Sequence, residues 1–98
     1  MYDIEYTQEA LVDLKSLQKS EQREILDAIV VQLRYEPTVQ TRNRKILRPN
    51  AVADWELRIG TFRVLYNVDE EVVVVEIQRI GKKERNIYYF RGQQEDLS

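Results

Sequence analysis

The 98-residue sequence contains no cysteine and no histidine. Without cysteine, disulfide bonds and thiolate metal sites are excluded, and this absence fits a cytoplasmic protein. Without histidine, Ser/His triads, imidazole acid–base catalysis and histidine-bound metals are excluded as well. Any catalysis must therefore use Lys, Arg, Tyr, Asp or Glu side chains, and no cofactor is expected.

Long apolar segments are also missing, so no contact with a membrane is expected. Residues 72–75 form an apolar run far shorter than the roughly 20 residues of a transmembrane helix. Residues 1–5 carry two acidic side chains, which is unlike a signal peptide. The length predicts a single domain over residues 1–98, and 43% hydrophobic residues allow a modest core.

The net charge of -2 is unevenly distributed along the chain. Residues 1–40 hold four cationic and eight anionic side chains, whereas residues 79–91 hold five cations and one anion. Such a distribution is found on ordinary mixed surfaces, but it also suits a local cationic site on a mildly acidic protein. Charge alone leaves both interpretations open.

The first third of the chain is predicted to contain one strand and two helices. In residues 2–6, Tyr and Ile alternate with acidic residues, which predicts a short strand with one apolar face. Thr7 and Ser20 are candidate N-caps, each followed by Leu or Ile at helical spacing. Pro37 should end the second helix near residue 35, because the residue before proline disfavours helix. Residues 7–35 therefore form a helical hairpin.

Residues 38–52 show no periodicity and contain a turn signal at Pro49-Asn50. This connector is basic, so it either is simply solvated or contacts an anionic ligand. Its cations are Arg42, Arg44, Lys45 and Arg48.

Three strands should follow the connector. Residues 55–59 and 62–67 alternate between apolar and polar side chains and are joined by a tight turn at Gly60-Thr61. After a second turn at residues 69–70, residues 72–80 are almost continuously apolar, as in a central strand that is covered on both faces. Gly81 is expected to end this strand.

The predicted fold class is α+β. It combines an N-terminal strand, a helical hairpin and a three-stranded antiparallel meander in one mostly antiparallel sheet, with the helices on one face. A short C-terminal tail follows, in which Glu95-Asp96 is expected to be mobile.

Cationic side chains should gather on the face of the sheet opposite the helices. Because side chains alternate along a strand, Glu56, Arg58 and Arg63 should point to that open face. The basic loop of residues 82–85 and the tyrosines at residues 88–89 should lie nearby, and guanidinium and phenol groups suit a polyanion. The alternative is that these are solvated strand positions with Glu56 as a cross-strand partner.

The residues of this sheet resemble those of a known family. Residues 55–66, Trp-Glu-Leu-Arg-Ile-Gly-Thr-Phe-Arg-Val-Leu-Tyr, closely resemble the central hairpin of RelE/ParE superfamily toxins. The valines at residues 73–75 and the later Ile-Gly-Lys-Lys-Glu-Arg at residues 80–85 resemble the last strand and basic loop of that family. With the order of elements, the resemblance covers about residues 1–90.

The resemblance implies a RelE-like toxin of a type II toxin–antitoxin system. RelE-like members cut mRNA on the ribosome without metal, through attack of a ribose 2′-hydroxyl on the adjacent phosphate, which leaves a 2′,3′-cyclic phosphate. The implied partners are a cognate antitoxin, the ribosome and mRNA, and operator DNA only through the antitoxin. Two alternatives remain: a ParE-like inhibitor of DNA gyrase, and a catalytically inactive member that binds its antitoxin.

The resemblance also implies roles for single residues. Arg63 and Lys83 match family positions that stabilise the charge on the pentacoordinate phosphate. Tyr89 matches a tyrosine that stacks on or orients the nucleotide, and Arg58 matches a hairpin lysine. Glu56 stands where the family often has a second lysine that is implicated as general base. The wider RNA-binding surface is expected to include Lys45, Arg48, Arg79, Lys82, Arg85 and Tyr88.

The residues themselves favour Glu56 as the base. Without histidine, a carboxylate is the side chain that is unprotonated at neutral pH. Lys and Tyr hold their protons there, because their unperturbed pKa values are ~10.4 and ~10. Lys83 or Tyr89 could then protonate the leaving oxygen. Separately, Val30 and Val31 widen the second helix beyond one apolar stripe. They either complete the core or leave an apolar surface for a partner.

Overall fold

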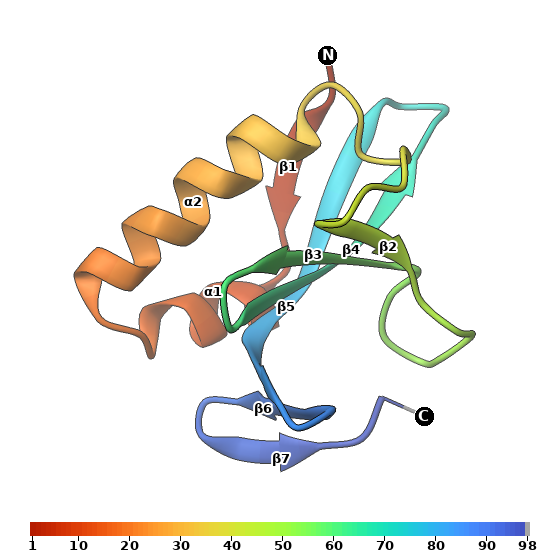
Figure 1. Cartoon of the computed structure of the whole chain (residues 1–98). Helices are drawn as coiled ribbons and strands as arrows, with labels where there is room; N and C mark the ends of the chain where they lie inside the picture. The colour runs from red at the N-terminus through yellow and green to blue at the C-terminus, as the bar shows by residue number, and fades with distance from the viewer. Residues whose placement is uncertain (98) are drawn as a thin grey trace.

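A computed structural model describes residues 1–97, which form two helices and one seven-stranded sheet (Figure 1). The strands follow the order β2-β3-β4-β5-β6-β7, with antiparallel pairing throughout, and β1 lies parallel to the first half of β5. The predicted α+β class and mostly antiparallel sheet are confirmed. The elements are β1 (Asp3–Tyr6), α1 (Gln8–Lys15), α2 (Lys19–Leu33), β2 (Arg44–Ile46), β3 (Trp55–Ile59), β4 (Phe62–Asp69), β5 (Val74–Glu84), β6 (Ile87–Phe90) and β7 (Gln93–Glu95).

The helix boundaries follow from local capping. The Thr7 side chain accepts a hydrogen bond from the backbone N–H of Ala10 at 3.1 Å, as predicted for the N-cap of α1. The second helix begins earlier than predicted, because Gln18 rather than Ser20 is its N-cap, with the Gln18 N–H donating to the Glu21 carboxylate at 3.1 Å. No helix within residues 1–97 is long and apolar enough to span a bilayer.

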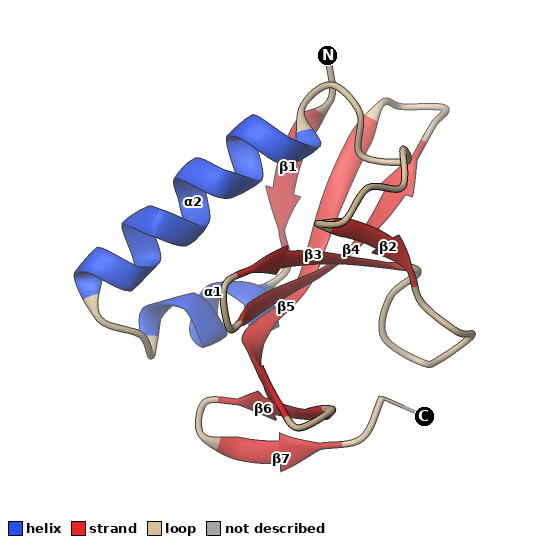
Figure 2. Ribbon diagram, in the orientation of Figure 1, coloured by secondary structure: helices blue, strands red, loops and turns tan. Residues whose placement is uncertain are grey.

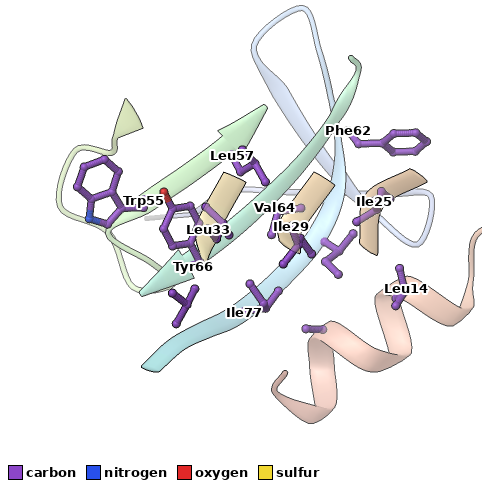
Figure 3. Packing of buried hydrophobic residues seen from close by; sticks show 13 residues of the cluster. Leu14, Ile25, Ile29, Leu33, Trp55, Leu57, Phe62, Val64, Tyr66 and Ile77 are labelled. Carbon is purple, nitrogen blue, oxygen red and sulfur yellow. The ribbon is translucent and has the colours of Figure 1, made fainter. Parts of the chain in front are cut away.

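The main core lies between the two helices and one face of the sheet (Figures 2 and 3). The helical stripes and the alternating strand residues meet there, as their periodicities predict. Tyr66 is fully buried at its centre, stacks on Trp55 with ring centroids 6.0 Å apart, and donates its hydroxyl to the carbonyl of Pro37 at 2.7 Å. Its other large members include Leu14, Ile25, Ile29, Leu33, Leu57, Phe62, Val64, Val75, Ile77 and Ile80.

The sequence predicted that the opposite face of the sheet is open. The structure shows that part of this face is covered. Leu65 is fully buried there, together with Phe90 and Ala53, in a second small core. The strand β5 does not end at Gly81 but continues to Glu84, and the β6–β7 hairpin turns back across it. Gly81 permits this close approach, because a Cβ there would clash with the Tyr89 carbonyl and the Phe90 ring.

The connector between α2 and β3 is also more ordered than its composition suggested. It contains the short edge strand β2, and Arg44 at the start of that strand is only 8% exposed. The Arg44 guanidinium donates to the carbonyls of Val39 and Gln32, at 2.9 and 2.8 Å, and to the Gln32 side chain. This cation is therefore used to hold the connector against α2, and it is not available to a ligand.

A buried ion pair ties α1 to the C-terminal half of the sheet. Asp13, 1% exposed, accepts hydrogen bonds from Arg79 Nε at 2.7 Å and from the backbone N–H of Ile80 at 3.1 Å. Arg91 Nε lies 3.1 Å from the same carboxylate. Arg79 also lies 3.0 Å from the Glu95 carboxylate, and Glu95 is the last residue of β7. The prediction that Glu95 belongs to a mobile tail is therefore wrong.

Removing this carboxylate should destabilise the whole domain. In Asp13→Ala, Arg79 and the Ile80 N–H lose their buried acceptor, and we expect a loss of about 3 kcal/mol in the free energy of unfolding. Urea unfolding followed by circular dichroism measures it. The exposed carboxylate variant Asp27→Ala should change stability by less than about 0.5 kcal/mol. Equal midpoints for the two variants would contradict the role assigned to Asp13.

Candidate functional site

Glu56 is the centre of the candidate site, on the face of β3 that points away from the helices. It is 4% exposed, and its carboxylate is surrounded by groups that compensate its charge. The Tyr88 hydroxyl donates to Oε2, Arg63 Nε lies 3.6 Å from Oε1, and Lys83 Nζ lies 3.9 Å from Oε2. Burial of a lone carboxylate is costly, so this position requires the cations and the hydroxyl around it.

The strand register brings these side chains together. Arg58 pairs with Arg63 across β3 and β4, two residues along from Glu56, and Lys83 pairs with Tyr88 across β5 and β6. Because side chains alternate, all five project from the same face of the sheet. The predicted grouping of Glu56, Arg58, Arg63 and Lys83 on one face is therefore observed.

The Arg63 guanidinium is held rigidly against the sheet. Its Nη1 donates to the carbonyls of Gly60 and Phe62, at 2.8 and 2.9 Å, and its side chain is 11% exposed. Its buried Nε has no hydrogen-bond partner in the described part of the chain, since Glu56 is beyond hydrogen-bond distance. A buried donor without an acceptor is costly, so this nitrogen is suited to an anionic oxygen that enters the site.

Tyr88 is set to act as a hydrogen-bond donor. Its pKa is raised above the ordinary value by burial first, and then by the hydrogen bond to Glu56 and the negative charge there. The hydroxyl therefore stays protonated at neutral pH and holds the Glu56 carboxylate in place. The Lys83 ammonium lies 4.9 Å from the centre of the Tyr88 ring, a cation–π distance that keeps this cation beside the carboxylate.

Glu56, Arg63 and Lys83 line a hollow of about 360 Å³ whose wall is strongly cationic. A single carboxylate, Glu56, faces six cationic side chains and two amides. Such a wall attracts an anion of phosphate type, and arginine can present two donors to one phosphate. The lining residues are Arg42, Asn43, Lys45, Glu56, Arg58, Arg63, Lys83, Arg85 and Asn86.

Arg42, Asn43 and Asn86 were not among the residues predicted for the site. The first two lie in the connector, where no periodicity indicates the direction of a side chain. Asn86 had a local signal, because Asn favours the left-handed backbone of a two-residue hairpin turn. Arg85 and Asn86 form such a turn between β5 and β6, with φ of 52° and 66°.

Tyr89, which the resemblance implies stacks on or orients the nucleotide, does not line this hollow. It pairs with Lys82 across β5 and β6, so it projects to the helical side of the sheet. There it lines a separate hollow of about 430 Å³ with Leu17 and Gln18. The two-residue turn at residues 85–86 sets this register and places Tyr88, not Tyr89, against Glu56.

The remaining predicted RNA-binding residues divide between the two faces. Lys45 and Arg85 line the cationic hollow, and Arg48 lines a larger groove beside it. Lys82 lies on the helical side, 5.6 Å from the centre of the Phe62 ring. Arg79 differs most from expectation, because its guanidinium is engaged by Asp13 and Glu95 and stacks 4.2 Å from the Phe90 ring centre.

No group of three or more Asp or Glu side chains within residues 1–97 is arranged to hold a metal ion.

Comparisons with known proteins identify relatives of this fold. A family model described as the ParE toxin of the type II toxin–antitoxin system parDE matches residues 4–87. The crystal structure of the toxin–antitoxin complex RelBE2 from Mycobacterium tuberculosis is similar at 29% identity and a TM-score of 0.72, covering 84% of this chain and 98% of that chain. The archaeal RelE–RelB complex from Pyrococcus horikoshii OT3 is similar at 26% identity and a TM-score of 0.68, covering 86% and 97%.

The isolated Escherichia coli RelE toxin has the same fold, with a TM-score of 0.70 at 22% identity, and the match covers 87% of each chain. The search of curated proteins returned no match. These comparisons extend over most of the chain, but the family model ends at residue 87, before most of the β6–β7 hairpin.

Proposed function

Because the chain belongs to the ParE toxin family of type II toxin–antitoxin systems, within the RelE/ParE superfamily, we propose that it is an endoribonuclease that cuts mRNA on the ribosome. The observation that carries this proposal is the position of Glu56. A buried carboxylate stands beside Arg63, Lys83 and Tyr88 at the wall of a cationic hollow. This arrangement combines a proton acceptor with cations that can hold a phosphate.

The cleavage step uses these residues in defined roles. Arg58 and Arg63 bind the scissile phosphate, and one of the donors is Arg63 Nε, which has no hydrogen-bond partner among the described residues. Glu56 removes the proton of the ribose 2′-hydroxyl, and the 2′-oxygen attacks the phosphorus. The bond from phosphorus to the 5′-oxygen breaks, and Lys83 protonates that oxygen. The products are a 2′,3′-cyclic phosphate and a 5′-hydroxyl end.

Tyr88 supports this step as a positioning residue. Its hydroxyl occupies Oε2 of Glu56, so Oε1 remains as the atom that takes the proton from the ribose. Because the pKa of Tyr88 is raised, the phenol keeps its own proton and is poorly suited to give it to the leaving oxygen. Tyr89, on the other side of the sheet, has no role in this step.

A second candidate function is inhibition of DNA gyrase by binding, the activity implied by the resemblance to ParE toxins. The match of the ParE family model to residues 4–87 favours it. Induced expression in bacteria separates the candidates. Arrest of protein synthesis with mRNA cuts at defined codon positions supports the endoribonuclease, and DNA damage with intact messages supports gyrase inhibition. Normal growth with intact messages would indicate an inactive, antitoxin-binding protein.

A cognate antitoxin is proposed as the partner, since the similar structures from M. tuberculosis and P. horikoshii are toxin–antitoxin complexes. The second helix presents a surface that suits it. Val30 is 44% exposed and Val31 is 73% exposed, so these valines do not complete the core. Tyr35, two residues beyond the end of α2, is 68% exposed. An amphipathic helix of the antitoxin could cover this apolar surface.

Arg63→Ala should abolish mRNA cleavage. Loss of one donor to the transition-state charge typically costs about 3 kcal/mol, which corresponds to a decrease of roughly a hundredfold or more in the cleavage rate. Mapped message ends after induced expression measure it, with circular dichroism to confirm that the variant is folded. The exposed control Arg23→Ala on α2 should cut normally. A folded Arg63→Ala protein with full activity would refute the assignment.

Glu56→Gln tests whether the carboxylate is the base. The amide keeps the shape and can still accept from Tyr88, but it cannot take a proton, so cleavage should fall by about 10²- to 10⁴-fold. Glu76→Gln, an exposed substitution on the same sheet, is the matched control. If instead cleavage rises in Glu56→Gln, the carboxylate only neutralises the cations around it, and its role as base is wrong.

Val31→Asp should prevent binding of the antitoxin without unfolding the toxin. A buried charge at the interface opposes association, whereas the side chain is solvated in the free protein and stability should change by less than about 0.5 kcal/mol. Co-purification with the product of the adjacent reading frame measures the effect. Val72→Asp, at an exposed hairpin valine, is the control that should still bind. Unchanged binding by Val31→Asp would exclude this surface.

A further inference from the structure

A groove of about 770 Å³ adjoins the cationic hollow, and most of its lining residues have no part in the cleavage step. It runs between the segment 45–50 on one side and the C-terminal segments 86–88 and 94–97 on the other. Lys45, Lys83 and Asn86 line both the groove and the hollow, so the two are continuous. We propose that this groove binds the nucleotide next to the cleaved phosphate and selects its base, an inference that rests on the proposed endoribonuclease function.

The register of the sheet gives the groove its place relative to the chemistry. Lys45 on β2 pairs directly with Glu56 on β3, and Lys83 on β5 lies 3.9 Å from the Glu56 carboxylate. A single-stranded RNA whose scissile phosphate lies at Arg63 therefore continues past Lys45 or Lys83 into the groove. The nucleotide that follows the scissile phosphate in such a strand would lie in the groove, because the groove begins directly beside the hollow.

The groove wall suits a nucleobase flanked by a phosphate. Ile46, Leu47, Ile87 and Leu97 provide apolar side chains against which a flat ring can pack, and Asn86 and Gln94 provide amide donors and acceptors. The Tyr88 ring already has partners, because Lys83 Nζ lies 4.9 Å from its centre and Phe90 stacks on it with ring centroids 6.0 Å apart.

Charge at the groove also favours RNA. Lys45, Lys83 and the exposed Arg48 line it, and they can receive the phosphate of the bound nucleotide. Two carboxylates lie at its C-terminal end, Glu95 and Asp96. The charge of Glu95 is compensated by Arg79 at 3.0 Å, so it repels a phosphate less than a free carboxylate would.

Most of the second wall of the groove lies beyond the part of the chain that the family model matches, although Asn86 and Ile87 are inside it. The match ends at residue 87, whereas Gln94 and Leu97 belong to the segment that β6 and β7 carry across the sheet. In this proposal, the C-terminal hairpin supplies one side of the base-selecting groove, and the segment 45–50 supplies the other.

Nuclear magnetic resonance on the 98-residue protein tests the groove with a defined probe. The probe is an RNA tetranucleotide in which one 2′-deoxy sugar precedes the central phosphate, so that it binds but cannot be cut. The methyl signals of Leu47, Ile87 and Leu97 should shift together with the Lys83 and Asn86 signals. Shifts confined to the hollow would overturn the groove and leave the proposed function standing. No shift at either place up to millimolar RNA would overturn both.

A charge reversal gives an independent measurement. Arg48 lines the groove but not the hollow, so Arg48→Glu should weaken binding of the tetranucleotide by about tenfold and leave a 2′-deoxy dinucleotide unaffected. The exposed Arg23→Glu variant on α2, which makes the same change of net charge, should bind both probes as the unmodified protein does. Equal loss for both probes, or no loss for the tetranucleotide, would overturn the inference.

Discussion

Asp13 is a residue of α1 with 1% of its surface exposed. It accepts hydrogen bonds from Arg79 and from the backbone N–H of Ile80, which come 66 and 67 positions later in the chain. A carboxylate in such a place is stable only because Arg79, Arg91 and the Ile80 N–H compensate it. Arg79 in turn reaches Glu95 on β7, so one buried anion holds α1, β5 and the C-terminal hairpin together. The candidate site depends on this contact, since the hairpin carries Tyr88.

Glu56 repeats the same principle on the other face of the sheet. It is a buried carboxylate whose charge is balanced by Arg63, Lys83 and the hydroxyl of Tyr88. The balance has two consequences for function. It holds these side chains in fixed positions, which the proposed cleavage would need for electrostatic stabilisation of a transition state. It also lowers the positive charge of the hollow, although the six cationic side chains in the wall still outnumber this one carboxylate.

The relatives of this chain show that the fold alone does not identify a function, so a proposed function must be argued from the side chains of the site. The family model is that of a ParE toxin, whereas the similar crystal structures are RelE toxins and their complexes. One fold therefore accommodates toxins of different names, and membership of the superfamily does not choose a target. The proposal of RNA cleavage rests on the side chains that surround Glu56, and the groove beside them extends the proposal to the neighbouring nucleotide.

Local periodicity was enough to predict the fold class and one face of the site. Apolar residues that alternate along residues 55–66 determine which side meets the helices, so Glu56, Arg58 and Arg63 must share the other side. The resemblance to RelE/ParE toxins added Lys83, whose placement beside them the structure supports. These features depend on neighbours in sequence or on one strand pair, which is why the sequence alone determined them.

Only the tertiary structure decided that Tyr88, and not Tyr89, lies beside Glu56. It also separated the cations that line the hollow from the cations that hold the fold together. Arg44 and Arg79 look like binding residues in the sequence, yet they compensate carbonyls and carboxylates inside the protein. Their partners are 5 to 66 residues away, and the pairing follows from how helices and strands pack and not from any local pattern. The C-terminal hairpin is held in the same way, by long-range contacts that exist only once the chain has folded.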